Sequence, residues 1–336
     1  IRKINRSTDF KKIKTDIDNF KKLKILVIGE TIIDQYNFCE VIGKSGKEPM
    51  LVLKDVRQDQ YLGGVLGIAR NLSQLSKKIT VISMIGENKN HFDDIKKNLP
   101  KNIRNRLIFK EKSPTIVKKR YLDNLSNNKI IGIYDINDEI LTAKDEKKFH
   151  NIINREIKKH DLVIVSDYGH GLISKKSANL ICKKSKFLAL NAQVNASNIG
   201  YHTIRNYKNF NTLIINEKEI RHETRDKISK LEVLIINMAK EKNIQNLVVT
   251  MGKSGSMLYC KKKFYYSDAY AHKIVDKVGA GDTMLSLIGP CLKSNIDKNI
   301  TLLISSIAAA QSVETIGNKE TIKKLNMLKT LENMLK

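Results

Sequence analysis

Short apolar segments alternate with helix-length amphipathic segments along most of this chain of 336 residues. The apolar segments have the continuous pattern of buried strands and cover residues 24–29, 79–85, 162–165, 187–190, 213–215 and 247–249. The amphipathic segments cover residues 66–75, 146–159, 175–184, 226–242, 302–313 and 322–335. Parallel strands are joined by helical crossovers and are buried on both faces, so the alternation predicts an α/β fold with a mostly parallel central sheet. Ligands of such sheets bind beyond the carboxyl ends of the strands.

Two stretches interrupt this alternation, at residues 36–58 and 113–136. They are richer in Tyr, Val and Ile and contain short alternating patterns, which predict antiparallel strands inserted into the α/β frame. Four or so such strands would form a small lid sheet. The polar, Lys- and Asp-rich residues 1–22 are interpreted as an N-terminal arm or linker, so that the main domain covers residues 23–336.

The charge balance of the chain is strongly basic. Lys and Arg total 61 and Asp and Glu total 35, which gives a formal net charge of +26. Such a charge attracts nucleic-acid phosphates. The Lys residues are nevertheless scattered in pairs among Asn and Ile, no basic stripe carries interleaved aromatic residues, and Trp is absent. We therefore do not expect nucleic acid as the main partner.

The cysteines and the lengths of the apolar runs bear on the compartment. Cys39, Cys182, Cys260 and Cys291 lie far apart without a C-x-x-C pair, which argues against a zinc ribbon or a disulfide framework and favours the reducing cytoplasm. No apolar run approaches the roughly 18–20 residues of a membrane span, so no membrane partner is expected. The chain begins with Ile1 rather than Met, and we interpret it as a piece of a longer protein with an upstream domain.

The strongest chemical motif is residues 276–283, Asp-Lys-Val-Gly-Ala-Gly-Asp-Thr, which precede an apolar helical pattern. A small-residue turn that opens a helix leaves backbone N–H groups unpaired, and these groups and the helix dipole favour an anion such as phosphate. The anion hole would be formed by Gly279, Ala280 and Gly281. Asp282 would lie in the first helical turn, where its carboxylate can take the proton of an alcohol that attacks a bound phosphate. An ordinary helix start is the alternative, and the turn alone leaves both interpretations open.

With this motif the chain resembles the ribokinase-like carbohydrate kinases, often called the PfkB family, over about residues 24–320. The resemblance implies a ribokinase-like three-layer fold with a small β-sheet lid and ATP-dependent phosphoryl transfer to a hydroxyl group. It implies ATP and Mg²⁺ as cofactors, with K⁺ as an additional candidate. It also implies a homodimer formed through the lid, because exposed sheet edges and apolar lid faces favour a partner.

Several positions match the family's motifs in the expected order. Residues 29–34 resemble the first strand with its sugar-binding Asp, here Asp34, and Gly63-Gly64 resembles the diglycine turn beside the sugar. Residues 216–219 match an Asn-x-x-Glu motif, and residues 250–255 match a Thr-x-Gly-x-x-Gly turn that lines the nucleotide. The resemblance thereby implies Mg²⁺ organised through water at Glu219 and nucleotide contacts at Asn216, Thr250, Gly252 and Gly255.

Within the family, three segments are most similar to the kinase part of the bifunctional heptose-phosphate kinase/nucleotidyltransferases of the ADP-heptose pathway, namely residues 34–49, 113–120 and 166–171. This likeness implies a sugar-phosphate acceptor and a fused or upstream nucleotidyltransferase. Lys118 and Arg120 are then candidates for binding an anionic group of the substrate, although Lys and Arg on a strand often form a solvated face. His170 is a candidate for touching the substrate phosphate, with a water-facing side chain as the alternative.

The chain departs from the family pattern at several positions. Gly67 follows the diglycine turn where Asn is common, and Val278 replaces a common Thr before the glycines of the motif. Asn191 and Gln193 stand where heptose kinases have an Asp and a Lys, and Ser306 stands where an Asn that faces the nucleotide is common. None of these changes removes the base, the anion hole or the Asn-x-x-Glu motif.

Three hypotheses about function stay open on these residues. The first is an ATP-dependent sugar or sugar-phosphate kinase. The second is a catalytically weak or inactive kinase-like module that binds a sugar or a nucleotide in a bifunctional nucleotidyltransferase protein, and the substituted positions motivate it. The third is a nucleoside kinase, against which the lid segments similar to heptose kinases argue.

Overall fold

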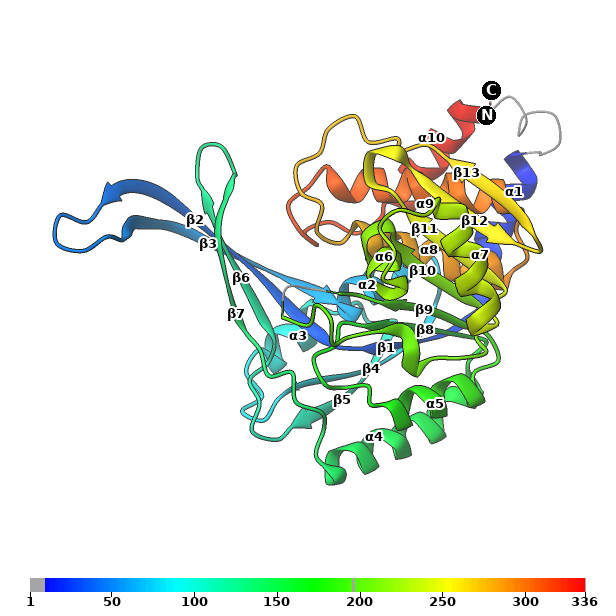
Figure 1. The fold of residues 1–336 in the computed structure, drawn as a ribbon, viewed down its shortest axis with the longest axis horizontal. Helices are drawn as coiled ribbons and strands as arrows, with labels where there is room; N and C mark the ends of the chain where they lie inside the picture. The colour runs from blue at the N-terminus through cyan, green and yellow to red at the C-terminus, as the bar shows by residue number, and fades with distance from the viewer. Residues whose placement is uncertain (1–9, 195–196, 336) are drawn as a thin grey trace.

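A nine-stranded sheet forms the centre of the molecule (Figure 1). The computed structural model describes residues 10–194 and 197–335, and the order of the strands in this sheet is β13-β12-β11-β10-β9-β8-β1-β4-β5. The strands are β1 (Lys24–Gly29), β4 (Lys78–Gly86), β5 (Ile103–Lys110), β8 (Leu162–Asp167), β9 (Leu188–Ala192), β10 (Thr212–Asn216), β11 (Asn246–Thr250), β12 (Ser256–Cys260) and β13 (Lys263–Ser267). The strands from β5 across to β11 run parallel, and β12 and β13 continue the sheet antiparallel. The predicted α/β fold is confirmed.

Helices cover both faces of this sheet (Figure 1). One side carries α2 (Val65–Ser73), α8 (Ala280–Lys293) and α9 (Lys298–Val313), and the other side carries α4 (Ala143–Glu156) and α5 (Lys175–Lys184). The other helices are α1 (Phe10–Asn19), α3 (Phe92–Asn98), α6 (Glu217–Thr224), α7 (Leu231–Lys242) and α10 (Lys324–Leu335). Because both faces are covered, the central strands are continuous apolar runs instead of alternating ones.

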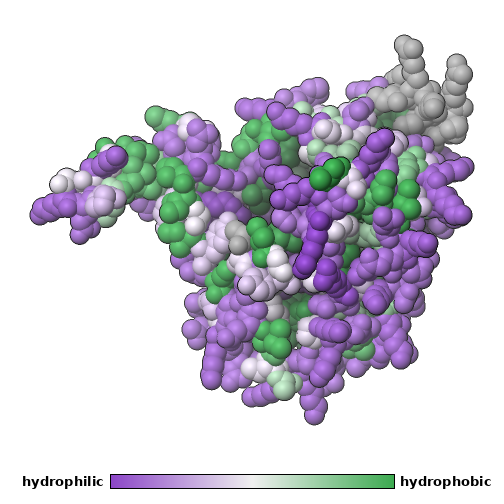
Figure 2. Space-filling view, in the orientation of Figure 1, coloured by the Kyte–Doolittle hydropathy of each residue, from purple (hydrophilic) through white to green (hydrophobic). Residues whose placement is uncertain are grey.

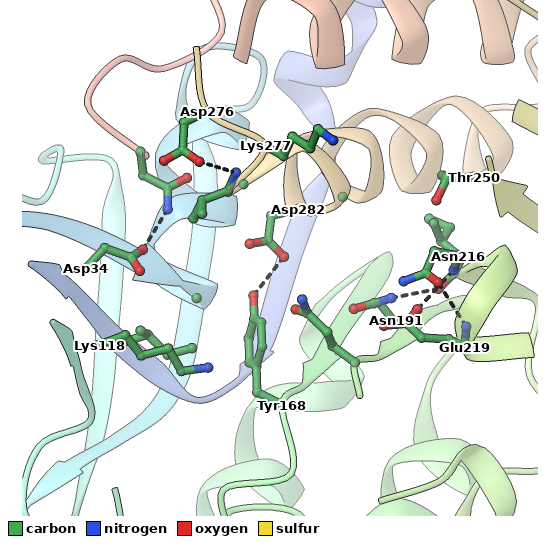
Figure 3. A pocket seen from close by; sticks show the side chains of 18 of the residues that line it. Asp34, Lys118, Tyr168, Asn191, Asn216, Glu219, Thr250, Asp276, Lys277 and Asp282 are labelled. Carbon is green, nitrogen blue, oxygen red and sulfur yellow. Dashed lines mark hydrogen bonds between the residues drawn. The ribbon is translucent and has the colours of Figure 1, made fainter. Parts of the chain in front are cut away.

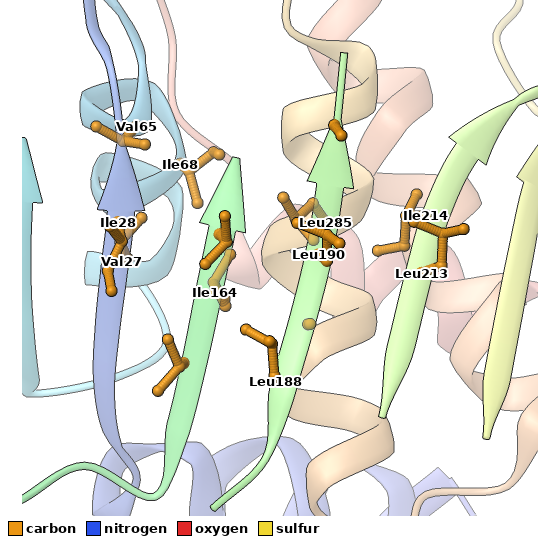
Figure 4. Packing of buried hydrophobic residues seen from close by; sticks show 14 of the residues in the cluster. Val27, Ile28, Val65, Ile68, Ile164, Leu188, Leu190, Leu213, Ile214 and Leu285 are labelled. Carbon is orange, nitrogen blue, oxygen red and sulfur yellow. The ribbon is translucent and has the colours of Figure 1, made fainter. Parts of the chain in front are cut away.

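The main core lies between the sheet and these helices (Figure 4). Val27, Leu190 and Leu213 on three of the strands are completely buried, and each such side chain contributes about 1.5–3 kcal/mol. α8 approaches β8 closely at Gly289, where an added Cβ would lie 3.3 Å from Ile164 Cδ1. This close packing holds the N-terminus of α8 at the carboxyl edge of the sheet.

A second, four-stranded sheet forms the lid, with strand order β3-β2-β6-β7. Its strands are β2 (Thr31–Lys44), β3 (Leu51–Gly64), β6 (Val117–Asp123) and β7 (Lys129–Asp135). The β2–β3 hairpin projects far from the main body (Figure 1). The prediction of purely antiparallel lid strands is wrong at the centre of this sheet, where β2 and β6 run parallel. The physical reason is that β2 continues β1 and β6 follows β5, so both leave the parallel sheet from the same edge in the same direction.

Part of the segment predicted as an N-terminal arm or linker is instead packed helix. Residues 10–22 form α1 and a short 3-10 helix. Ile13, Ile17 and Phe20 are buried in a second core cluster together with side chains of α9 and α10, such as Leu303 and Leu331. The apolar residues of this stretch recur with helical spacing, which gives the helix a face to bury although its composition is polar.

Some elements differ from the sequence-based prediction. The helix predicted over residues 226–242 begins at Leu231, because the Asp226 carboxylate accepts hydrogen bonds from the backbone N–H groups of Ile228 and Ser229 and closes a turn there. The antiparallel pair β12–β13 was not expected from the alternation. All four cysteines are free thiols. In the described part of the chain, no helix is both long and apolar enough to cross a membrane.

Candidate active site

A cavity of about 390 Å³ lies at the carboxyl edge of the central sheet, between the lid strands and the start of α8 (Figure 3). We call it the acceptor chamber, after the role proposed for it below. It is lined by side chains or backbone from the lid (Asp34, Gly64, Lys118, Arg120, Lys129), from the sheet edge (Tyr168, Asn191, Gln193, Asn216, Glu219, Thr250) and from the motif loop (Asp276, Lys277, Val278, Gly279, Gly281, Asp282), together with Asn318. The location agrees with the general rule for ligands of parallel sheets.

The Gly-Ala-Gly turn forms the start of α8. Gly279 precedes the helix with φ +87°, a conformation that glycine adopts without strain, and a Cβ there would lie 2.5 Å from Asn318 Oδ1. Gly281 has open space where a Cβ would stand. The first N–H groups of a helix lack partners within the helix, so this bare turn can take phosphate oxygens.

Asp282 stands in the first turn of α8 and lines the acceptor chamber. Its Oδ1 accepts a hydrogen bond of 2.7 Å from the Tyr168 hydroxyl. Burial raises the pKa of Asp282 to about 7, and the Tyr168 hydrogen bond acts in the opposite direction. A carboxylate with a pKa near neutrality is suited to exchange a proton with a bound hydroxyl.

Asp34 lies on β2 across the chamber from Asp282 (Figure 3). Its Oδ1 accepts a 2.7 Å hydrogen bond from Arg120 Nη1, and its Oδ2 accepts a 3.1 Å hydrogen bond from Asn318 Nδ2. A Cβ at Gly63 would lie 2.1 Å from Asp34 Oδ2, so only glycine allows this approach. Gly64, with φ +56°, turns the chain from β3 into α2. Gly63 therefore supports Asp34, while Gly64 lines the chamber itself.

The lid brings three cations to the acceptor chamber. Arg120 pairs with Asp34, and Lys129 Nζ pairs with Asp276 Oδ1 at 2.6 Å. The buried Lys118 instead lies with its Nζ 5.6 Å and 6.0 Å from the ring centroids of Tyr134 and Tyr168. Burial lowers the pKa of Lys118 because water no longer solvates the ammonium group. An anionic ligand in the chamber would compensate for the lost solvation, because its negative charge would stabilise the ammonium group.

His170 is a predicted substrate-binding residue whose side chain the structure places outside the chamber. Its side chain is fully buried and is absent from the lining of the chamber among the described residues. Its Nδ1 lies 2.7 Å from Asp138 Oδ1, and its backbone N–H donates to the buried carboxylate of Glu30. The predictions of a phosphate contact and of a water-facing side chain are both wrong, because the chain after β8 turns this ring into the interior.

Asn216 and Glu219 form a capping box at the start of α6. Asn216 Oδ1 accepts from the Glu219 N–H, and Glu219 Oε2 accepts from the Asn216 N–H, both at 2.9 Å. Glu219 Oε1 accepts from the Val194 N–H, and burial raises the pKa of Glu219. This carboxylate at the start of α6 also lines the chamber. Within the described residues, no three His, Cys, Asp or Glu side chains converge to hold a metal.

A second cavity of about 660 Å³ adjoins the first, and we call it the nucleotide chamber, after the role proposed for it below. Small and apolar residues dominate its lining, which includes Ala269, Ala271, Ile274, Ala280, Met284, Ala309, Ala310 and Val313. The predicted residues Gly252 and Gly255 lie here with φ +59° and +84°, and Ser306 lies here too. A Cβ at Gly255 would lie 2.0 Å from the Ser267 carbonyl oxygen, so this turn requires glycine. The residues that line both chambers are Thr250, Lys277 and Gly281.

The structure adds functional candidates that the sequence analysis missed. Tyr168 and Glu30 lie inside segments that carried the resemblance, yet nothing in those segments showed their contacts. Asn318 is far from the motifs in sequence and reaches Asp34 only through the fold. At Gly67 an added Cβ would lie 3.2 Å from Asn318 Oδ1, so this glycine makes room for Asn318. Asn191 uses its Nδ2 to donate to the Ile214 carbonyl.

Comparison with known proteins shows the family and the fold to which this chain is similar. The pfkB family carbohydrate kinase model matches residues 22–325. The protein named Bifunctional protein HldE from Campylobacter concisus is 29% identical over 304 residues, and that from Campylobacter jejuni strain RM1221 is 24% identical over 302 residues. Each match covers 89% of this chain and 62% of the relative, so the chain spans less than two thirds of these relatives.

Solved structures share the fold. Phosphofructokinase-2 from Escherichia coli in complex with potassium superimposes with a TM-score of 0.72, 13% identity and coverage of 93% of this chain and 99% of that one. The nucleoside kinase of Methanocaldococcus jannaschii gives a TM-score of 0.67 at 18% identity, with coverage of 93% and 99%. Arabidopsis thaliana ribokinase complexed with ribose and ATP gives 0.67 at 18% identity, with coverage of 91% and 99%. This chain belongs to the pfkB family and is a carbohydrate kinase.

Proposed function

We propose that this kinase transfers the terminal phosphoryl group of ATP to a hydroxyl group of a sugar or sugar phosphate. The single observation that carries the proposal is the place of Asp282. Asp282 directly follows Gly281, which borders both chambers, and Asp282 itself lines the acceptor chamber. A hydroxyl group held in the acceptor chamber can therefore meet a phosphoryl group that enters from the nucleotide chamber.

The acceptor chamber supplies groups that suit a sugar phosphate. Asp34 offers carboxylate oxygens for sugar hydroxyls, and Arg120 and Asn318 hold that carboxylate in place. Asn318 also supplies an amide beside Asp34 and next to Gly67, so it can take the role of the Asn that is common in the family at that glycine. The buried Lys118 is suited to an anionic substituent, since a buried ammonium group is stable only with a counter-charge.

The turn at Gly279–Gly281 would stabilise the charge on the phosphoryl group during transfer, because its N–H groups are fixed before the reaction begins. Lys277, which borders both chambers, would add a positive charge at the point of transfer. The polar pair Asn216 and Glu219 fits a water-mediated Mg²⁺, a mode that this ion commonly uses with nucleotides. Mg²⁺ bound there with ATP would neutralise phosphate charge. K⁺ stays a prediction, supported by the potassium complex of phosphofructokinase-2.

In the proposed reaction the acceptor oxygen attacks the γ-phosphorus and forms a new O–P bond. The bond between this phosphorus and the bridging oxygen breaks, and ADP leaves. The acceptor proton passes to the Asp282 carboxylate. Positioning and electrostatic stabilisation supply most of the catalysis in phosphoryl transfer, which agrees with a site made of glycines, cations and one carboxylate.

The experiment is ATP turnover with a panel of sugars, sugar phosphates including heptose phosphates, and adenosine. Preference for a phosphorylated sugar supports the role of Lys118. Preference for a heptose phosphate would agree with the sequence likeness to heptose-phosphate kinases. Turnover of adenosine would favour a nucleoside kinase. Tight binding of a sugar or nucleotide without phosphorylation of any panel member would favour a non-catalytic module. Equal turnover by the wild type and Asp282→Asn would overturn the role of Asp282.

The lid supports a further part of the proposal, a homodimer. Apolar side chains are exposed along the projecting β2–β3 hairpin, namely Val41, Ile42, Met50, Leu51 and Val56. Figure 2 shows hydrophobic residues gathered on this arm. Exposed apolar patches of this kind commonly mark protein interfaces. Light scattering at micromolar concentration tests the dimer, and a monomer there would contradict it.

The lengths of the relatives support a proposal about the whole protein. The HldE proteins are named bifunctional, and this chain matches 62% of their length. This supports a fused domain, which we propose to be a nucleotidyltransferase. A cytoplasmic location is a separate proposal that rests on the free cysteines. The coding sequence on both sides of this chain tests the first, and fractionation of the native cell tests the second.

A further inference from the structure

The hydroxyl group of Tyr168 lies beside the base of the proposed reaction. Its oxygen is 2.7 Å from Asp282 Oδ1, and the side chain is almost fully buried while still lining the acceptor chamber. Figure 3 shows the ring rising from the sheet edge to the carboxylate, with the second oxygen of Asp282 on the side of Asp34. One oxygen of the base is thus occupied by the protein, and the other faces the acceptor position.

The position of the Tyr168 backbone is set by hydrogen bonds to both its N–H and its C=O group. The fully buried carboxylate of Glu30 accepts the N–H of Tyr168 at 3.0 Å and the N–H of His170 at 3.2 Å. The Tyr168 carbonyl accepts from Asn198 Nδ2 at 2.8 Å. Gly169 follows with φ +71°, which a residue with a side chain rarely adopts. The backbone at Tyr168 is therefore held through both its N–H and its C=O, and the burial of the side chain limits rotation of the ring away from Asp282.

We propose that Tyr168 is a positioning residue that occupies Oδ1 of Asp282 and directs the proton of the acceptor hydroxyl to Oδ2. This inference rests on the proposed kinase function. The step balances without a further reactant, because the acceptor loses one proton, Asp282 Oδ2 gains it, and Tyr168 keeps its own. A tyrosine fits this role, since burial raises its pKa well above the usual value and keeps the hydroxyl protonated.

Other charged groups face Asp282 from the elements around it. Asp34 on β2 and Glu219 on α6 disfavour its ionised form, and Lys118 on β6 favours it. Burial disfavours the ionised form most of all. The hydrogen bond from Tyr168 stabilises the carboxylate against these effects, so loss of the hydroxyl group raises the pKa of Asp282.

The first experiment is the pH profile of kcat/KM for Tyr168→Phe, because that ratio reports the base in the free enzyme. We expect the acidic limb to move to higher pH by about one unit, the size expected for loss of one hydrogen bond to a charged group. Site-specific replacement of Tyr168 by 3-fluorotyrosine, a stronger donor, moves the limb to lower pH. Tyr134→Phe is the matched control, since it removes the hydroxyl group of another tyrosine whose ring lies near Lys118, on β7, and its limb stays in place.

The second experiment does not depend on turnover. Carbon-13 NMR of protein labelled at the aspartate carboxyl carbons, assigned with Asp282→Asn, follows the titration of Asp282 directly. A higher midpoint in Tyr168→Phe than in the wild type supports the inference. Equal midpoints, or an equal loss of activity at every pH, would overturn it. If the wild type phosphorylates no acceptor, the proposed function fails, and the NMR midpoints still decide the contact between Tyr168 and Asp282.

Discussion

The two chambers differ in how they are built. The acceptor chamber is the smaller one and contains charged side chains that are held by partners, as in the pair Asp34–Arg120. The nucleotide chamber is larger and has walls of alanine, valine and methionine. Fixed charges select a ligand by its polar groups, whereas an apolar cavity selects mainly by shape and size. Under the proposed function, this difference would mean that the acceptor is recognised by charge and the base of the nucleotide by fit, with the chemistry where the chambers meet.

The largest effect on kcat is expected when the carboxylate of Asp282, where the two chambers meet, is removed. Asp282→Asn keeps the shape of the side chain but cannot accept the proton, so we expect kcat to fall by about 10²–10⁴-fold. Binding of ATP in the nucleotide chamber is expected to change little. Steady-state kinetics and calorimetry measure the two effects. A matching fall in ATP affinity would break the separation between the chambers.

The same residue makes activity and stability depend on pH. Because the pKa of Asp282 is raised to about 7, kcat/KM should increase as the pH rises through 7. The raised pKa also means that the ionised carboxyl group costs folding free energy above that pH and costs none below the unfolded-state pKa. Asp282→Asn should therefore raise the melting temperature more at pH 8 than at pH 5. An equal change at both pH values would contradict the raised pKa.

A smaller effect is expected within the acceptor chamber alone. Asp34→Asn removes a charged acceptor of sugar hydroxyls and weakens the pair with Arg120, so we expect the KM for the acceptor to rise by about tenfold to a hundredfold. The KM for ATP should stay unchanged. Asp55→Asn is the matched control, since Asp55 is exposed on β3 and lines neither chamber. A rise in the KM for ATP alone would show that the chambers are assigned the wrong way round.

A comparable or smaller effect is expected at the boundary between the chambers. Lys277→Met removes the cation that borders both chambers, and we expect kcat to fall by about tenfold, the size of one charge interaction in the transition state. Lys277→Arg should recover part of the rate. Lys273→Met removes the same charge from an exposed position in the same loop and should leave the rate unchanged. Equal rates for Lys277→Met and the wild type would remove this residue from the mechanism.

The smallest expected effect concerns the surface charge. The net charge of +26 attracts anionic ATP and sugar phosphates, and salt screens this attraction. Raising the ionic strength is expected to lower kcat/KM for ATP by about threefold. The value for a neutral sugar acceptor should hardly change. Identical salt dependence for charged and neutral acceptors would show that surface charge has no part in substrate capture.

Local patterns predicted the parts of the molecule that depend on local structure. The apolar runs marked the strands because strands buried on both faces need them, and the Gly-Ala-Gly turn marked the start of α8. The parallel pairing of β2 with β6 could not be predicted from local patterns. It arises because β2 follows β1 and β6 follows β5, and β1 and β5 run in the same direction in the central sheet. The packing of residues 10–22 depends on a partner surface from the C-terminal helices, which no local pattern contains.

The candidate site also contains some residues that local motifs predicted and one that they misplaced. Asp34, Lys118, Arg120 and Asp282 were predicted from motifs and meet in one chamber. His170 was predicted from its segment and is buried beside Asp138 instead. A side chain's direction after a strand depends on a few backbone torsions, which the residue types do not reveal.

The sequence by itself predicted an α/β fold of the pfkB family, with a glycine turn and a carboxylate at the start of a helix. The tertiary structure decided which groups surround that carboxylate. Tyr168 and Asp282 are 114 residues apart, and Asn318 is 284 residues from Asp34. Such contacts arise only when distant strands and helices pack, because burial and hydrogen-bond partners are properties of the folded chain. The pKa of Asp282 and the shape of the two chambers therefore belong to the fold.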